Sequence, residues 1–346
     1  MTSDTQPVHL GAALTATDFD GVERRLAAME DAEAAVVLAS GVAATACAML
    51  ALLRTGDHLI ASAWLYGATR LFFERELPSI GIQVTFIDPT ELRAWRRAVQ
   101  ANTRVLFLES PVNPTTRVVD LRHVRRLTEE HGIALVVDST FATPVNCKPL
   151  GHGADVVVHS ATEYLNGQAN GSAGVVCGTE ALVDEVREKM AVWGPVPDPA
   201  CVDRLQHGLE TLAVRLERQN ASALRVAQWV EAHAGVRRVL YPGLASHPDH
   251  AVAGRMFDGF GASVALSLAG GPSAAERLFG AVTVFRTTPA IGGVVSSIHQ
   301  PVRTTHRALT APARLAMGFD GSMIQLHVGL EDADDLIADL SQALVS

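Results

Sequence analysis

The stretch VVDSTFATPVNCKPLGHGADVVVHSATEYLNG (136–167) decides the fold. It begins inside the apolar run ALVVD (134–138) and contains a second run, DVVVH (155–159). Short apolar runs bounded by Gly, Pro and Ser are typical of buried strands. Asp138 ends the first run, and Ser160 follows the second. The stretch therefore predicts two buried strands with polar groups at their carboxyl ends.

The same alternation continues on both sides of this stretch. Further strands are expected at 58–62, 83–87, 104–110 and 174–178, and helices at 42–54, 66–78, 120–131 and 180–191. Apolar runs alternating with amphipathic segments predict stacked βαβ units around a mostly parallel sheet. In such sheets ligands bind beyond the carboxyl ends of the strands, where Ser40, Glu109, Asp138 and Ser160 are expected.

The chain divides after the proline-rich segment GPVPDP (194–199). Residues 1–200 are predicted to form a large α/β domain, and 201–233 to form a bridging helix. Residues 234–346 contain alternating apolar runs and an amphipathic terminal segment, DADDLIADLSQAL (332–344). This pattern predicts a smaller α+β domain.

Composition narrows the class of protein. The chain has 346 residues, 48% of them hydrophobic, and a net charge of -9. The chain is acidic and has no Lys/Arg-rich run that could neutralise phosphates. Nucleic acid is therefore not expected as a partner. The N-terminus has no signal-peptide pattern and no apolar run long enough to cross a membrane, so we expect a cytoplasmic protein. Four widely spaced cysteines suggest neither disulfides nor a metal site.

The run 136–167 resembles the cofactor segment of the Cys/Met-metabolism family of pyridoxal-phosphate (PLP) enzymes, which includes cystathionine γ-synthase, cystathionine γ-lyase and methionine γ-lyase. The likeness extends through 39–62, 65–69, 109–115, 208–224, 239–250 and 328–340. It implies a fold-type I, aspartate aminotransferase-like fold, and a homodimer or homotetramer that acts on small molecules.

The resemblance also implies roles for the retained residues. Those expected to bind cofactor are Ser40, Gly41, Val42, Tyr66, Asn113, Asp138, Ser160 and Thr162. Backbone N–H groups at a helix start, with two hydroxyls, suit a phosphate. Asp138 matches the carboxylate on the pyridine nitrogen, which makes the ring an electron sink. Tyr66 matches the aromatic residue stacked on the ring, and Asn113 the amide at the ring oxygen.

The departures from the family pattern lie at catalytic positions. Glu163 stands where the family has its Schiff-base lysine, and a carboxylate has no amine to form an imine. Gln325 stands in place of the arginine that binds the substrate carboxylate, and Ala290 in place of a serine. Near the N-terminus, Gly11 and Ala13 replace a phosphate-binding tyrosine and arginine, and the arm is shortened.

Some substitutions suggest new chemistry. His327 follows Gln325 by two positions on an expected strand, so both side chains face the same way. His327 and Glu163 are candidates for an acid/base pair, with Tyr66 and Asp138 as further catalytic residues. Arg286 and Arg303 are candidates to restore one anion contact. The alternatives are a packed strand histidine and solvated arginines.

Three functions stay open. The first is an enzyme of specialised metabolism that uses the old cleft for lysine-independent acid/base chemistry with Glu163. We expect no covalently bound cofactor there: either pyridoxal or pyridoxamine phosphate is held noncovalently, or the cofactor is lost. The second is a non-catalytic subunit in a hetero-oligomer with a complete homologue. The third is a conventional C–S lyase or transsulfuration enzyme in which Glu163 is an engineered substitution.

Overall fold

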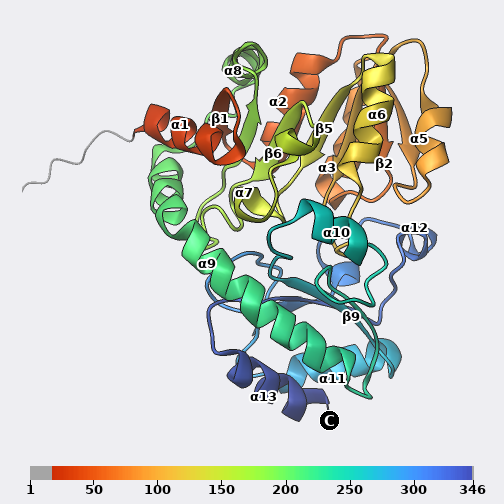
Figure 1. The fold of residues 1–346 in the computed structure, drawn as a ribbon, viewed down its shortest axis with the longest axis vertical. Helices are drawn as coiled ribbons and strands as arrows, with labels where there is room; N and C mark the ends of the chain where they lie inside the picture. Colours follow the sequence, from red (N-terminus) through yellow and green to blue (C-terminus); the bar gives the residue numbers. More distant parts are fainter. Residues whose placement is uncertain (1–17, 345–346) are drawn as a thin grey trace, which may run out of the picture.

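A computed structural model describes residues 18–344 and contains two β-sheets, with a long helix that runs from beside the first sheet to the second (Figure 1). The first sheet has the strands β1 (Ala34–Leu38), β2 (His58–Ser62), β3 (Gln83–Ile87), β4 (Thr103–Glu109), β5 (Ala134–Asp138), β6 (Val156–Ser160) and β7 (Gly174–Gly178). The second has β8 (Val236–Leu240), β9 (Ser263–Leu268), β10 (Arg286–Thr287), β11 (Ser297–His299) and β12 (Met323–His327).

The first sheet is mostly parallel. Its strand order is β1-β7-β6-β5-β4-β2-β3, and β7 alone runs in the opposite direction to the other six strands. The central strands are almost wholly apolar and buried, as expected for strands covered on both faces. Their carboxyl ends therefore present Glu109, Asp138 and Ser160 along one edge of the sheet.

Helices cover both sheets (Figure 1). They are α1 (Phe19–Glu30), α2 (Gly41–Leu52), α3 (Gly67–Leu71), α4 (Leu77–Ser79), α5 (Leu92–Ala98), α6 (Leu121–His131), α7 (Thr143–Asn146), α8 (Glu180–Trp193), α9 (Pro199–Glu231), α10 (His250–Met256), α11 (Gly271–Ala281), α12 (Ala311–Ala316) and α13 (Ala333–Leu344), with a π-helical turn η1 (Phe72–Glu76) and 3₁₀ turns η2 (Pro149–His152) and η3 (Pro301–Arg303). Side chains of Asp120 and Thr179 accept hydrogen bonds from the first turns of α6 and α8, which explains where those helices begin.

Most sequence predictions for the first sheet are confirmed. The expected strands at 58–62, 83–87, 134–138 and 174–178 are observed with those bounds. Strand β1 was not predicted, although the run AAVVL before Ser40 carries the signal. The helix expected at 66–78 is instead three successive pieces, because a π-helical turn interrupts it.

Helix α9 connects the two sheets and packs closely against the loop that carries Glu163. A Cβ on Gly208 would lie 2.4 Å from the carbonyl oxygens of Leu165 and Asn166, so only glycine allows this approach. Arg215 on the same helix is 6% exposed and donates to the carbonyl oxygens of Tyr164 and Gly208 at 2.9 and 2.8 Å. The helix therefore fixes this loop. The domain boundaries at 200 and 233 stay predictions.

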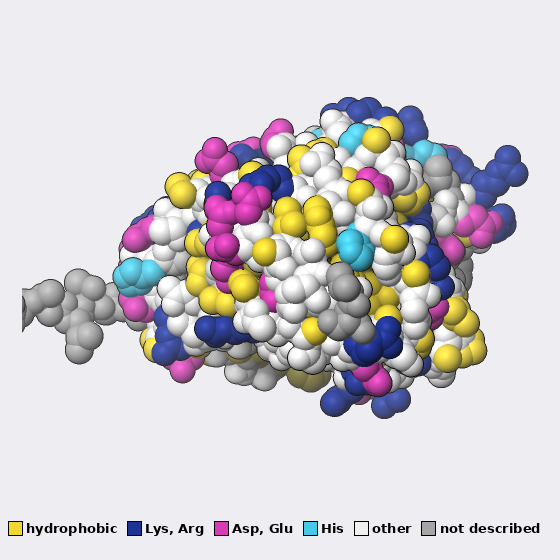
Figure 2. Space-filling model, turned by 90° about the horizontal axis from the view of Figure 1, so that it is seen from below, with side chains coloured by type: hydrophobic (Ala, Val, Ile, Leu, Met, Phe, Trp, Pro, Cys, Tyr) yellow, Lys and Arg dark blue, Asp and Glu magenta, His cyan; other side chains and the backbone are white. Residues whose placement is uncertain are grey.

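The surface seen from below mixes acidic, basic and apolar side chains (Figure 2). In the described part of the chain, every helix is too short or too polar to cross a lipid bilayer.

Candidate active site

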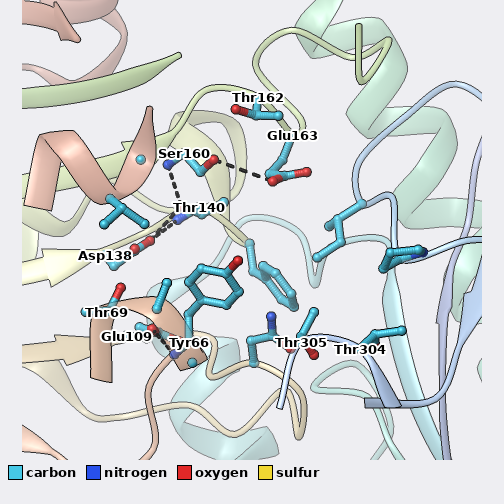
Figure 3. Close-up of a pocket in the computed structure, with 18 of the residues that line it drawn as sticks. Tyr66, Thr69, Glu109, Asp138, Thr140, Ser160, Thr162, Glu163, Thr304 and Thr305 are labelled. Carbon is cyan, nitrogen blue, oxygen red and sulfur yellow. Dashed lines mark hydrogen bonds between the residues drawn. The ribbon is translucent and has the colours of Figure 1, made fainter. Parts of the chain in front are cut away.

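A cavity of about 740 Å³ opens at the carboxyl edge of the first sheet. Its walls come from the loops after β1, β4, β5 and β6, from the start of α3, and from segments 289–291 and 303–308 before α12 (Figure 3). The predicted cofactor residues all line it: Ser40, Gly41, Val42, Tyr66, Asn113, Asp138, Ser160 and Thr162, together with Glu163. Residues distant in sequence thus meet where the parallel sheet predicts.

Glu163 projects into this cavity from the loop after β6 (Figure 3). Its Oε1 accepts a weak hydrogen bond of 3.5 Å from the Ser160 hydroxyl. Burial raises the pKa of Glu163 to about 7, the Ser160 hydrogen bond opposes this, and the charge of Asp138 adds to it. Glu163 is therefore a carboxyl group that exchanges its proton near neutral pH.

Asp138 and Glu109 form the acidic floor of the cavity. Asp138 Oδ1 accepts from the backbone N–H and the hydroxyl of Thr140 at 3.0 and 2.6 Å. Burial raises the pKa of Asp138, although the Thr140 hydrogen bonds oppose the shift. Burial and the neighbouring Asp138 together hold the pKa of Glu109 well above its usual range. The D-x-T spacing of an Asx turn could have indicated Thr140, which was not predicted.

Tyr66 lies within the same group of side chains (Figure 3). Its side chain is 40% exposed, and its backbone N–H donates to Glu109 Oε1 at 2.6 Å. Burial, Glu163 and Glu109 all raise the pKa of the Tyr66 phenol, so it stays protonated at neutral pH. The phenol is thus a proton donor in the same cavity as Glu163.

The start of α2 packs directly against Ser160 at the end of β6. Ser40 caps the helix by accepting from the Ala43 N–H at 3.1 Å. A Cβ on Gly41 would lie 2.7 Å from the Cβ of Ser160, so glycine is needed for these segments to meet. The unsatisfied N–H groups of a helix start suit an anion such as phosphate. Thr162 lines the cavity beside them, with its hydroxyl donating to Ala173.

Two predicted residues do not reach the cavity. Gln325 is fully buried, and its amide donates to the Pro114 carbonyl oxygen at 3.3 Å. His327 is also buried, and its Nδ1 lies 2.7 Å from the Ser263 hydroxyl. Among residues 18–344 no hydrogen bond joins His327 to Glu163, so the predicted acid/base pair is not formed. Burial holds the pKa of His327 well below its usual range, as in a packed strand histidine.

The two arginines predicted to bind an anion, Arg286 and Arg303, do not come together in the cavity. Arg303 lines the mouth of the cavity but forms an ion pair with Glu276, and Arg286 is exposed on β10. Ala290 lies between two lining residues, Pro289 and Ile291, and is not itself in the lining. Arg307 lines the mouth and has no ion-pair partner in the described chain. No motif in the sequence indicated Arg307. Gly11 and Ala13 lie outside the described residues.

This fold and this cavity define a class: an α/β protein with a cofactor-type cleft at the carboxyl ends of a mostly parallel sheet. The chain superposes with a TM-score of 0.91 on the crystal structure of cystathionine γ-synthase from Xanthomonas oryzae pv. oryzae, at 33% identity, covering 94% of this chain and 84% of that one. It is 40% identical over 324 residues to the O-succinylhomoserine sulfhydrylase of Pseudomonas aeruginosa, covering 94% of this chain and 80% of that protein. It is 36% identical over 341 residues to the L-methionine γ-lyase of Pseudomonas putida, covering 98% and 86%.

The model of the family described as "Cys/Met metabolism PLP-dependent enzyme" matches residues 14–345. The chain belongs to this family and has the fold-type I architecture of PLP enzymes, as predicted. Its relatives are transsulfuration and C–S lyase enzymes by name.

Membership corrects one prediction. The sequence suggested that no cofactor is bound covalently and that pyridoxal or pyridoxamine phosphate is at most held noncovalently. This is wrong for the family to which the chain belongs, because its members are PLP-dependent and hold PLP as a lysine Schiff base.

The cavity fits part of this cofactor. The start of α2 with Ser160 suits the phosphate, Asp138 suits the ring nitrogen, and Tyr66 suits the ring face. Bound there, PLP would supply an electron sink. The described lining contains no lysine. The chain has two lysines; Lys148 pairs with Asp31 at 2.9 Å, and Lys189 lies on α8. The ring and phosphate positions therefore fit the cofactor, and position 163 does not fit the lysine link.

Proposed function

We propose that this protein is an enzyme that performs acid/base chemistry on a small molecule in this cavity, with Glu163 as the proton-transfer group. The observation that carries the proposal is Glu163 itself, a carboxyl group in the cavity wall with a pKa of about 7. A general acid or base works best when its pKa lies near the operating pH. The reaction belongs to specialised metabolism in this proposal, because the lysine position has been rebuilt as an acid.

The surrounding residues support this role. The Ser160 hydroxyl donates a weak hydrogen bond to one oxygen of Glu163, and Glu163 lines the cavity. The protonated Tyr66 phenol can donate a proton to a substrate from which the Glu163 carboxylate removes one, and both groups regain their starting states by exchange with water. The charge of Asp138 raises the proton affinity of Glu163 further.

The test measures solvent deuterium in three candidate substrates taken from the relatives: O-succinyl-L-homoserine, L-cystathionine and L-methionine. A group that moves a proton to or from carbon leaves deuterium from D₂O in the substrate, which mass spectrometry detects. Wild type should incorporate deuterium into at least one of them, and Glu163→Gln should lose at least 100-fold in rate. Equal rates in the two proteins would show that Glu163 is not the proton-transfer group.

A second candidate is a non-catalytic subunit that stabilises a complete homologue. One observation favours it: the amide of Gln325 turns into the core toward Pro114, so the residue expected to hold substrate does not face the cavity. In that case neither wild type nor Glu163→Gln would exchange deuterium. Mixing with an active homologue would then give a hetero-oligomer on size exclusion.

A further inference from the structure

A second cavity, of about 840 Å³, lies between α5 and α6. The two helices pack side by side at the right-hand edge of the first sheet in Figure 1. The cavity shares no lining residue with the candidate active site. Its volume is in the range of pockets that hold small organic ligands. We call it the arginine groove.

Positive charge dominates this groove. Arg93, Arg96, Arg97 and Arg126 line it, and Glu130 is its one lining carboxylate among the described residues. Counting also Glu91, which pairs with Arg97 at 2.5 Å, four positive charges face two negative ones, a local excess of two. The whole chain carries -9, so the groove opposes the overall charge. Such a site attracts an anion.

Two of the arginines are available to a ligand. Arg93 has no hydrogen-bond or ion-pair partner in the described chain, and Arg126 contacts only the ring nitrogen of His123, at 3.0 Å. Both side chains are exposed. Guanidinium groups bind phosphate oxygens in pairs of parallel hydrogen bonds, so Arg93 and Arg126 suit a phosphorylated ligand.

The rest of the groove suits a planar aromatic group. Arg96 donates to both oxygens of Glu130, at 2.9 and 2.6 Å, which holds its guanidinium in one plane. Beneath lie the buried side chains of Trp95, Val124 and Leu127, at 1%, 1% and 6% exposure. A fixed guanidinium plane over an apolar floor is a surface on which an aromatic ring stacks.

We propose that the arginine groove binds a nucleoside phosphate, with the base on the Arg96–Glu130 plane and the phosphates at Arg93 and Arg126. The ligand needs both parts, because a bare phosphate leaves the exposed Arg96–Glu130 plane uncovered and a bare nucleoside leaves Arg93 and Arg126 without an anion. This site is independent of the chemistry at Glu163.

The experiment measures binding to the full-length protein by calorimetry at 150 mM salt without magnesium. The probes are ATP, adenosine and inorganic triphosphate. ATP should bind at least tenfold more tightly than either part. Arg93→Ser/Arg126→Ser should weaken ATP at least tenfold, and Arg96→Met should weaken ATP but not triphosphate. Arg24→Ser is the control. Arg24 is an exposed residue of α1, at the opposite edge of the sheet in Figure 1, and its loss removes the same charge as Arg96→Met, so ATP affinity should change less than twofold.

Three results would overturn the proposal. Triphosphate binding as tightly as ATP would show that the groove responds to charge alone. An equal loss in Arg24→Ser would show a diffuse field and no defined site. No ATP binding at 1 mM would show that the groove takes no nucleoside phosphate.

Discussion

Glu109 and Asp138 are register partners on the neighbouring parallel strands β4 and β5, so two buried carboxyl groups lie side by side at the edge of the first sheet. Like charge and burial both favour the protonated acid in such a pair. Glu163 faces the same cavity from the next loop, and its own pKa rises to about 7. The cavity is thus an acidic site whose proton content changes near neutral pH.

Glu163→Gln should stabilise the protein at alkaline pH. A carboxyl whose pKa rises on folding binds its proton more tightly in the folded chain, so its contribution to stability is full at low pH and is lost between about 4.5 and 7. Glutamine imitates the protonated acid at every pH. Because Glu163 is partly open to the cavity, we expect a gain of about 1 to 3 kcal/mol at pH 8 and almost none at pH 4.5. Urea unfolding at both pH values measures it, and a gain that is the same at both would contradict the assigned pKa.

Glu163→Lys should acquire a link to PLP at residue 163. The cavity retains the residues that suit the ring and phosphate, and lysine at this position supplies the missing amine. After incubation with PLP and reduction with borohydride, peptide mass should place the pyridoxyl group in the segment 155–170. Glu163→Gln is the control and should show no adduct there. If the lysine variant also showed none, the cavity would not hold the cofactor in the expected orientation.

Gly41→Ala should destabilise the fold by about 1 to 3 kcal/mol, because the new methyl group meets the Cβ and backbone Cα of Ser160 at 2.7 and 2.9 Å. Gly254→Ala on α10 is the matched control, since nothing lies within 4 Å of its added Cβ. Alanine favours a helix, so this variant should be neutral or slightly more stable. Thermal unfolding of both proteins gives the comparison, and similar losses in the two would refute the close contact at Ser160.

Arg215→Met should cost about 1 to 3 kcal/mol of stability, because it keeps the apolar stem but removes the donor to the carbonyl oxygen of Tyr164, while the Gly208 carbonyl keeps the Thr211 hydroxyl. Burial lowers the pKa of Arg215 to about 10, because removal from water disfavours the charged guanidinium. Arg225→Met removes an exposed ion pair with Asp334 and should cost less than about 1 kcal/mol. Chemical denaturation distinguishes the two. A small effect at Arg215 would mean that α9 does not fix the loop that carries Glu163.

Local sequence was enough to predict most strands of the first sheet, the cleft at their carboxyl ends and the carboxylate at residue 163. Runs such as ALVVD are apolar at every position because parallel strands are covered on both faces, so their place in the sheet could be predicted locally. Strand ends in a parallel sheet share one edge, which brought Ser40, Asp138 and Ser160 together as expected. That residue 163 cannot form an imine follows from its identity alone, because a carboxylate has no amine.

The contact partners of the polar and charged side chains could not be predicted from local sequence and depend on the tertiary structure. His327 has the right spacing to face Gln325, but packing places it against Phe141 and Ser263 and not against Glu163. Arg303 reaches the cavity mouth yet is held by Glu276 on α11, and Arg307 is left there without an ion-pair partner in the described chain. A side chain's partner and burial depend on segments far away in the sequence. For that reason the raised pKa of Glu163, and with it the proposed proton transfer, needs the folded cavity.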